Sequence, residues 1–286
     1  MSLGFVGLGV MGSRMCANLI RKSGQRVVVY DPMPEATEPA AALGADVVPD
    51  LAALEADVVF LSLPTISEVE SVAGILAGVA HKPRVLVDMG TSEVGRSRAL
   101  ASRLADDGVV FADAPVARTR QAAEDGTLLI TVGAPGDVFE TLRPLLECMG
   151  TDVVHAGGVG NGQVLKILNN MVLFLTMNAL AEALAIGRAA GVDGEALFSA
   201  LTLGSADSFA LRRTGTATML PDEFPERAFP TDYAIKDLAL ALQLAEDGEV
   251  PAHAAQQTMD LLRRTSDAGY GPNYYPVMIK LVDGRG

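Results

Sequence analysis

Two kinds of side chain that bind metals or form crosslinks are scarce in this sequence. Among 286 residues there are two cysteines, Cys16 and Cys148, and three histidines. The cysteines are isolated and lack both the spacing of a metal site and a secretory context, so we expect reduced thiols in a cytoplasm. Because the histidines are far apart in the sequence, no metal site is predicted.

Basic residues are also few. Lysine and arginine together number 22 against 35 acidic residues, which gives a net charge of -13. A nucleic acid or an anionic membrane surface needs a basic face on its partner, so we predict neither as a partner. A small anion needs only a local cluster of basic side chains and backbone amides, and is compatible with an acidic protein.

The sequence also predicts neither a signal peptide nor a membrane-spanning segment. The first predicted strand begins almost at Met1, which leaves no room for a signal peptide. The apolar run of residues 171–175 is interrupted by Thr176 and Asn178, too soon to span a bilayer. The length and the 49% hydrophobic content predict about two globular domains. We therefore expect a soluble, cytoplasmic protein.

The first motif lies at the N-terminus, where a buried strand at residues 3–6 leads into a helix that is predicted to end near Lys22. The turn between them has the pattern G-x-G-x-x-G. The first glycine allows a tight turn, the second lets a pyrophosphate approach the backbone, and the third lets helix and strand pack closely. The motif, which predicts a dinucleotide site at the helix N-terminus, consists of Gly7, Leu8, Gly9, Val10, Met11 and Gly12.

The next predicted strand, residues 26–30, ends in Asp31. An acidic residue at this place binds the adenosine ribose hydroxyls and repels a 2′-phosphate. Pro32, Met33 and Pro34 follow, so no basic residue stands ready for NADP. The pattern predicts NAD as the cofactor.

Strands and helices then alternate, with strands at residues 58–62, 85–88 and 109–112. Ligands of open α/β sheets lie beyond the carboxyl ends of the strands, so Leu63, Pro64 and Thr91 are predicted to line the cofactor groove. Pro64 is equally well explained as a strand stop, and Thr91 as a helix cap.

A loop after the strand at residues 109–112 carries Arg118 and Arg120. The planar fork of an arginine suits a carboxylate or a sulfonate, and the loop follows a strand near the predicted nicotinamide end. The other interpretation is a solvated charged loop, since Glu124 and Asp125 come soon after.

A proline-free apolar stretch from Asn161 to Ala190 predicts one long helix. Lys166, Asn169 and Asn170 are spaced i, i+3 and i+4 on it and therefore share a face. Such a cluster is unusual on an apolar helix and indicates either a functional site or a solvated stripe. The rest of the chain is predicted to be helical, at residues 194–203, 212–220, 232–244 and 251–268 and from residue 276. Lys236 and Asp237 lie at the start of one of these helices, where a surface pair would contribute little.

With these motifs in place, the chain resembles the β-hydroxyacid dehydrogenase family, which includes 3-hydroxyisobutyrate dehydrogenase, over nearly its whole length. The resemblance lies in residues 7–12 with Asn18-Leu19, in 63–64, 113–116 and 162–170, and in Lys236-Asp237-Leu238. It implies an N-terminal Rossmann NAD-binding domain, residues 1–160, and an all-helical substrate and dimerisation domain, residues 161–286. It also implies a homodimer or homotetramer.

The resemblance assigns roles to three of these residues. Lys166 is implied to be catalytic, Asn170 to bind the substrate, and Lys236 to lie beside the cofactor. Asn169, on the same helix face, is predicted to bind the substrate as well. An ammonium aimed at a carbonyl oxygen would stabilise its growing charge and donate the proton. The implied reaction is NAD-dependent hydride transfer between nicotinamide and the terminal carbon of a small anionic 3-hydroxy acid or semialdehyde.

One segment departs from the family pattern. Most members continue Asp-x-Pro-Val with Ser-Gly-Gly, whereas this chain has Ala117, Arg118 and Thr119. The variant is similar to the branch that contains 3-sulfolactaldehyde reductase, in which the arginine is taken to bind a sulfonate. Arg118 and Thr119 are therefore predicted to bind the substrate.

Other functions remain open at this stage. The same fold could act on 3-hydroxyisobutyrate, serine, or succinic or tartronic semialdehyde. Imine-reducing relatives typically lack the lysine that this chain has at position 166. A non-catalytic binding module is disfavoured by that lysine and by the acidic charge, and a nucleotide-sugar dehydrogenase by the setting of the two cysteines.

Overall fold

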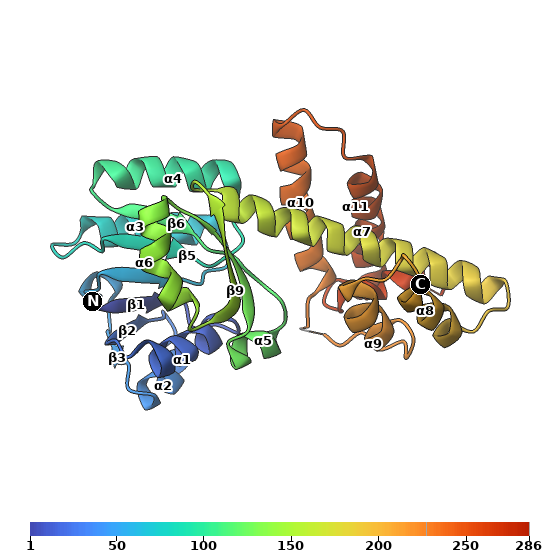
Figure 1. Ribbon diagram of the computed structural model, residues 1–286, viewed down its shortest axis with the longest axis horizontal. Coiled ribbons are helices and arrows are strands. Elements are labelled where there is room, and N and C mark those ends of the chain that lie inside the picture. Colours follow the sequence, from blue (N-terminus) through green and yellow to red (C-terminus); the bar gives the residue numbers. More distant parts are fainter. Residues whose placement is uncertain (227, 286) are drawn as a thin grey trace. The chain divides into compact units, whose positions relative to one another are not determined.

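The computed structural model of the protein describes residues 1–226 and 228–285. It forms two compact units, Met1–Lys166 and a second unit that begins at Ile167. Figure 1 traces both.

The first unit is built on one sheet with the strand order β3-β2-β1-β4-β5-β6-β8-β7, and β9 pairs with β8. The strands from β3 to β6 are parallel to their neighbours, while β8 runs antiparallel to β6 and β7. The order reverses direction beside β1, which is where an open α/β sheet binds its ligand. The strands are β1 (Leu3–Val6), β2 (Val27–Tyr30), β3 (Asp46–Val47), β4 (Val58–Leu61), β5 (Val85–Asp88), β6 (Val110–Asp113), β7 (Val116–Ala117), β8 (Leu128–Gly133) and β9 (Gly150–Gly157).

Helices cover both faces of this sheet, as Figure 1 shows. Strand side chains point alternately to the two faces. Phe5 lies in a core with residues of α1 and α6, and Val6 in a core with residues of α3 and α4. Central strands that are buried on both faces read as continuous apolar runs, as β2 and β4 do. The helices are α1 (Gly12–Ser23), α2 (Pro34–Ala42), α3 (Ile66–Gly78), α4 (Val94–Asp106), α5 (Arg120–Asp125) and α6 (Gly136–Leu146), with the 3-10 turn η1 (Leu51–Ala53).

The second unit is helical apart from two isolated bridges, Glu226 with Asn273 and Pro230 with Tyr274, in the described part of the chain. Helix α7 (Asn161–Ala189) begins in the first unit and continues into the second, and ends within one residue of the prediction. The elements after it are α8 (Gly194–Leu203), η2 (Ala210–Gly215), α9 (Thr216–Thr218), α10 (Thr231–Asp247), α11 (His253–Thr265), η3 (Ser266–Tyr270), η4 (Tyr275–Met278) and α12 (Ile279–Val282). This combination confirms the predicted fold class, a Rossmann domain followed by a helical unit.

Two helix predictions in the second unit were wrong in detail. The segment predicted as a helix at residues 212–220 forms a π-helical stretch, η2, and the single turn α9. The helix predicted at 251–268 ends at Thr265 and gives way to a π-helical stretch that contains Gly269 with a φ of 95°. A local hydrophobic pattern does not distinguish α from π hydrogen bonding, and glycine enters the left-handed region readily.

Among the described residues, α7 is the one helix that is long and apolar enough to cross a membrane by length and composition alone. The prediction that no run is long enough to span a bilayer rested on the interruption at Thr176 and Asn178, whereas the helix as a whole meets this criterion of length and composition. One such helix is weak evidence for a membrane span, since core helices of soluble proteins pass the same test.

Candidate active site

The glycine loop follows β1 and opens α1, as the motif predicts. Gly7 has a φ of 89°, and a Cβ there would lie 2.3 Å from the carbonyl oxygen of Ser62. A Cβ on Gly12 would lie 2.0 Å from the carbonyl oxygen of Gly7. At Gly9, by contrast, a Cβ would meet no described atom within 4 Å, and the neighbouring Val10 is exposed. The loop therefore has two tightly packed glycines and one open approach to its backbone.

The N-terminus of α1 offers its positive end to this open approach. In the described structure no side chain caps this helix, and no acidic residue occupies its first turn. Leu8 of the loop is buried at 4% exposure. An uncapped helix N-terminus beside an open glycine suits a phosphate group.

Asp31 lies beside the glycine loop at the carboxyl end of β2. One carboxylate oxygen accepts the backbone N–H of Leu8 at 2.7 Å, and the other accepts that of Met33 at 2.9 Å. These bonds use one acceptor position on each oxygen, and the side chain is partly exposed. The carboxylate is thus held at the loop while keeping acceptor capacity.

Leu63 and Pro64 follow β4, and Thr91 follows β5, as predicted. Thr65 caps the following helix α3 by accepting the N–H of Ser67 at 3.2 Å. Helix α4 has Glu93 at its N-cap position, so Thr91 is not a helix cap, and that alternative for Thr91 was wrong.

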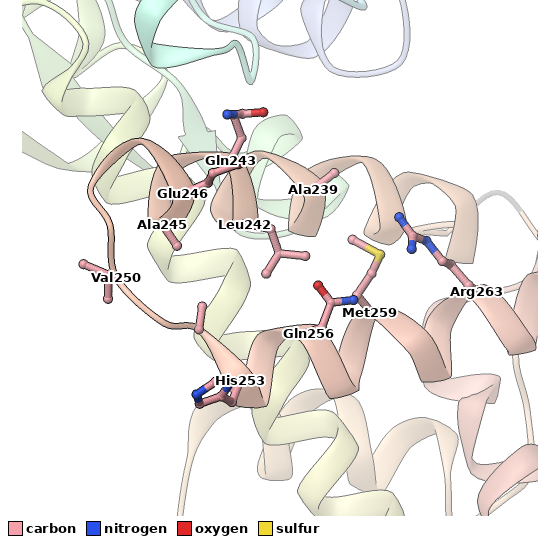
Figure 2. A pocket seen from close by; sticks show the side chains of 11 residues that line it. Ala239, Leu242, Gln243, Ala245, Glu246, Val250, His253, Gln256, Met259 and Arg263 are labelled. Carbon is pink, nitrogen blue, oxygen red and sulfur yellow. The ribbon is translucent and has the colours of Figure 1, made fainter.

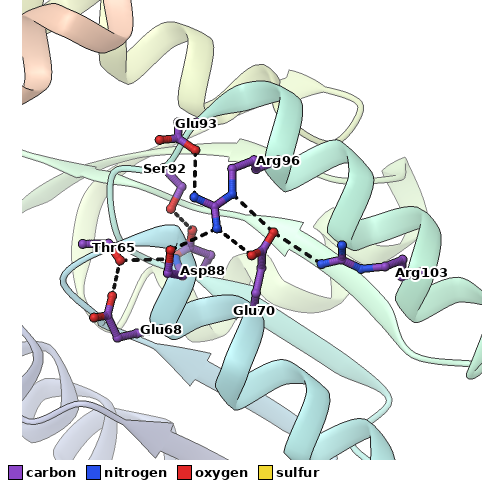
Figure 3. A network of polar contacts seen from close by, with 9 residues as sticks. Thr65, Glu68, Glu70, Asp88, Ser92, Glu93, Arg96 and Arg103 are labelled. Carbon is purple, nitrogen blue, oxygen red and sulfur yellow. Dashed lines mark hydrogen bonds and ion pairs between the residues drawn. The ribbon is translucent and has the colours of Figure 1, made fainter.

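A charged network ties α3 to α4 near these loops (Figure 3). Arg96 bonds Glu70 at 2.6 Å and Glu93 at 3.2 Å, and Arg103 reaches Glu70 at 3.3 Å. The bond to Arg96 is the main cause that lowers the pKa of the Glu70 carboxyl. The network fixes two helices whose N-termini follow the predicted cofactor loops.

Two buried aspartates end neighbouring strands, and their role was missed by the sequence analysis. Asp88 and Asp113 are opposite each other in the register of β5 and β6, and both are 0% exposed. The two oxygens of Asp113 accept the backbone N–H groups of Gly160 at 2.6 Å and Gln163 at 2.8 Å. These are donors at the start of α7 that lack partners within the helix. Asp113 therefore caps α7 from a strand far away in sequence.

Room for this carboxylate depends on glycines. A Cβ on Gly133 would lie 2.3 Å from Asp113 Oδ1, and one on Gly162 would lie 2.7 Å from Oδ2. The signal in the sequence was an aspartate that ends an apolar strand, but the sequence does not show which amides it meets.

Burial, opposed by the bonds to Gly160 and Gln163, raises the pKa of Asp113 from 3.8 to about 6. An acid whose pKa is raised by folding adds stability below its unfolded pKa and loses that contribution as the pH rises through the folded value. Between about pH 5 and pH 7.5, we expect the unfolding free energy of the parent to fall by about 1.5 kcal/mol more than that of an Asp113→Asn variant, which cannot titrate at this position. Urea unfolding of both proteins across this range measures the difference. A difference that stays constant, or that changes in favour of the parent, would contradict the expectation.

Lys166 and the two asparagines lie on α7. Lys166 is half-buried, Asn169 is exposed and Asn170 is 4% exposed. The side-chain amide of Asn170 donates to Asp237 at 2.8 Å and accepts from Asn169 at 3.2 Å. The interpretation of this helix face as a fully solvated polar stripe is therefore wrong.

Lys236 and Asp237 lie in the first turns of α10. Asp237 is 4% exposed, so the surface-pair interpretation is wrong for its carboxylate. The Lys236 ammonium lies 4.9 Å from the centre of the Tyr233 ring, a cation–π distance.

Arg118 has a backbone φ of 89°, in the region that favours glycine, which is the residue the family pattern has here. Its guanidinium donates to the carbonyl of Thr127 at 2.6 Å and to the Thr151 hydroxyl at 3.1 Å, and pairs with Asp152 at 2.7 Å. The hydroxyl of Thr119 caps α5 by accepting the N–H of Ala122 at 3.2 Å. Both predicted anion-binding side chains thus have partners within the first unit.

A pocket of about 470 Å³ lies between α10 and α11. Figure 2 shows the side chains that line it. Its described lining includes none of the predicted site residues. Within the described residues no group of three histidine, cysteine, aspartate or glutamate side chains is placed to hold a metal ion.

Known protein families match both parts of the chain. The family model for the NAD binding domain of 6-phosphogluconate dehydrogenase matches residues 2–158. The model described as the NAD-binding domain of NADP-dependent 3-hydroxyisobutyrate dehydrogenase matches residues 160–282. The chain belongs to the β-hydroxyacid dehydrogenase family. It is therefore an oxidoreductase of the hydroxyacid dehydrogenase type that binds NAD or NADP.

Similar members of the family cover nearly the whole chain. The 3-hydroxyisobutyrate dehydrogenase of Pseudomonas aeruginosa is 36% identical and covers 99% of each chain. The 2-(hydroxymethyl)glutarate dehydrogenase of Eubacterium barkeri is 33% identical over 98% of this chain and 94% of its own. A structure of Mycobacterium tuberculosis 3-hydroxyisobutyrate dehydrogenase with L-serine superposes with a TM-score of 0.89, at 29% identity and 98% coverage of each chain.

Proposed function

We propose that this β-hydroxyacid dehydrogenase interconverts a small anionic 3-hydroxy acid and its semialdehyde with NAD(H). In this proposal residues 1–160 form the NAD-binding domain and residues 161–286 the substrate and dimerisation domain, with Arg118 and Thr119 as further substrate-binding residues. The observation that carries the proposal is helix α7, which has Lys166 one turn before the buried Asn170 and starts at the carboxyl ends of β5 and β6.

The glycine loop and Asp31 fit a dinucleotide, because Gly9 is open, α1 is uncapped and a carboxylate lies at the end of β2. When bound, the nicotinamide supplies or accepts the hydride. Leu63, Pro64 and Thr91 line the same edge of the sheet, and Lys236 lies beside the cofactor. Asp31 favours NAD over NADP, because its charge would face a 2′-phosphate.

Lys166 performs the acid–base step in this proposal. In reduction its ammonium faces the substrate carbonyl oxygen, stabilises the charge that develops there and donates the proton. In oxidation the neutral amine accepts the proton of the alcohol. Asn170, oriented by Asp237, binds the same substrate without adding charge, and Asn169 lies beside it.

The proposal also concerns which anionic group the substrate carries. Ala117, Arg118 and Thr119 replace the usual serine and two glycines. The arginine and threonine favour a sulfonate such as 3-sulfolactaldehyde. The ion pair of Arg118 with Asp152 is partly exposed to water, and such surface pairs contribute little to stability, so a substrate anion can compete for the guanidinium. 3-Hydroxyisobutyrate, serine, and succinic or tartronic semialdehyde are the carboxylate candidates, and serine is supported by the mycobacterial relative.

Steady-state turnover tests the proposal, with 3-sulfolactaldehyde and succinic and tartronic semialdehyde reduced by NADH or NADPH. 3-Hydroxyisobutyrate and serine are tested in the oxidation direction with NAD or NADP. Preferred turnover of one anionic semialdehyde with NADH is expected. Bound NADH with no turnover of any of them would refute the substrate class.

An Arg118→Ala variant distinguishes the anions. Alanine keeps the Cβ and its backbone preference, so only the guanidinium is lost. We expect KM for the sulfonate aldehyde to rise about tenfold, as for one lost charged hydrogen bond, with a smaller change for carboxylates. Asp152→Ala is the matched control, because it releases the same guanidinium and should leave this KM unchanged or lower. Equal increases in both variants would mean that Arg118 only fastens its loop to β9.

We further propose a cytoplasmic homodimer or homotetramer. Val172 and Ile186 on α7 are 57% and 68% exposed, and a second copy would cover them. The first turn of α7 is bound to the sheet by Asp113, as in the core helix of a soluble protein. The two relatives described above by sequence are dehydrogenases, which gives no support to a non-catalytic binding module.

A further inference from the structure

The side chain of Gln163 joins two segments of the first unit that are distant in sequence. Its Oε1 accepts the backbone N–H of Ser92 at 3.0 Å, and its Nε2 donates to the carbonyl of Gly90 at 2.9 Å. Gln163 is 0% exposed and Ser92 is 3% exposed, so water does not compete for these bonds. The first turn of α7 is thereby fastened to the loop that follows β5.

Asp88, the last residue of β5, also binds this loop. Its carboxylate accepts the Gly90 N–H at 2.9 Å and the Ser92 hydroxyl at 2.7 Å. Thr91, between these two residues, is left as the part of the loop that is neither buried nor bonded to Gln163. The loop is thus held on both sides of a residue that we place at the cofactor.

The other end of this connection is Lys166. Residues at i and i+3 are neighbours on a helix surface, so Gln163 and Lys166 lie one above the other on α7. The single amide group of Gln163 accepts from an N–H and donates to a C=O of the same loop. A hydrocarbon side chain of similar length would leave both backbone groups buried without that partner.

We propose that Gln163 is a positioning residue, which sets the distance between Lys166 and the cofactor by fastening the start of α7 to the Gly90–Ser92 loop. This inference rests on the proposed function. Gln163 does not touch the reacting atoms, and it acts through the loop and the helix. The proposed cofactor-binding glycine loop and Asp31 follow β1 and β2, and the hydrogen bonds of the Gln163 side chain do not involve them.

The test uses the full-length protein with Gln163→Met and the shorter amide of Gln163→Asn. The control is Thr131→Val, which removes the bond from the Thr131 hydroxyl to the Gly162 carbonyl at 2.9 Å. That bond holds the same turn of α7 but does not touch the loop. Amide hydrogen exchange of residues 89–93 and 160–166 is measured without cofactor, and kcat, KM and the isotope effect with deuterated NADH are measured with it.

For both Gln163 variants we expect faster exchange in the two segments together. We also expect kcat to fall at least about tenfold, as for loss of orientation, while the Kd of NADH changes less than about threefold. In Thr131→Val only residues 160–166 should exchange faster, with kcat within about threefold of the parent. The isotope effect should rise in the Gln163 variants, because hydride transfer becomes slower.

Unchanged exchange in the Gly90–Ser92 loop, or a kcat no lower than in Thr131→Val, would overturn the proposal. Should the parent itself turn over no hydroxy acid or semialdehyde, the proposed function fails. The exchange measurement then still decides whether Gln163 joins the loop to the helix.

Discussion

Replacing Lys166 with alanine is expected to lower kcat by about 10³-fold, because the reaction loses both its proton donor and the charge that faces the carbonyl oxygen. The affinity for NADH should stay within about threefold, since Lys166 lies on α7 and the elements that we propose to bind the phosphates are the glycine loop and α1. Single-turnover measurement of NADH oxidation with the best aldehyde from the substrate comparison gives the hydride-transfer rate directly. NADH binding is followed separately by fluorescence.

Lys82→Ala is the matched control for this experiment. Lys82 forms an ion pair with Asp107 at 3.5 Å on the surface, so its removal takes away the same charge without touching the site. Its kcat should equal that of the parent. A Lys166→Ala variant that kept more than about a tenth of the parent kcat would show that another group donates the proton.

Replacing Asp31 with serine is expected to shift the ratio of kcat/KM for NADH to that for NADPH by about 10²-fold toward NADPH. In the proposed site the carboxylate accepts a charged hydrogen bond from the ribose, worth about 1.5–3 kcal/mol, and would repel a 2′-phosphate. The ratio is the useful quantity, because the loss of the bonds to Leu8 and Met33 loosens the loop for both cofactors alike. Serine is small enough to leave room for a phosphate.

Asp46→Ser provides the comparison at equal net charge. Asp46 lies on the neighbouring strand β3, where it pairs with Arg26 at 2.6 Å and is exposed. This variant should keep the parent's cofactor ratio. If Asp31→Ser also kept it, the preference for NAD would have to come from another residue, and the ribose role of Asp31 would be lost.

The fold and much of the cofactor half of the site could be predicted from the sequence because their signals are local. The turn from β1 to α1 needs glycine at residues 7 and 12, where any Cβ would collide with backbone carbonyls. Apolar strands such as residues 58–61 must be covered on both faces. A long stretch of apolar residues without proline predicts a continuous helix, which is α7. Steric exclusion and periodicity act over a few residues, so they are visible in a linear sequence.

The partners of the site residues could not be predicted, because they are joined by contacts between distant segments. Gln163 and Ser92 are 71 residues apart in sequence, and Asp113 and Gly160 are 47 apart. Nothing in the local pattern says which buried amide a carboxylate will meet. Arg118 illustrates the same limit, since its residue type indicated an anion ligand and its observed partner is Asp152.

The sequence by itself determined the alternation of strands and helices, the glycine loop with Asp31, and the spacing of Lys166 with Asn170 on one helix. These follow from backbone sterics and from the 3.6-residue period of the helix. Only the tertiary structure decided that Asp113 caps α7 and that Gln163 fastens it to the Gly90–Ser92 loop. A buried hydrogen bond requires two groups within about 3 Å, and that proximity arises when β5, β6 and α7 pack together.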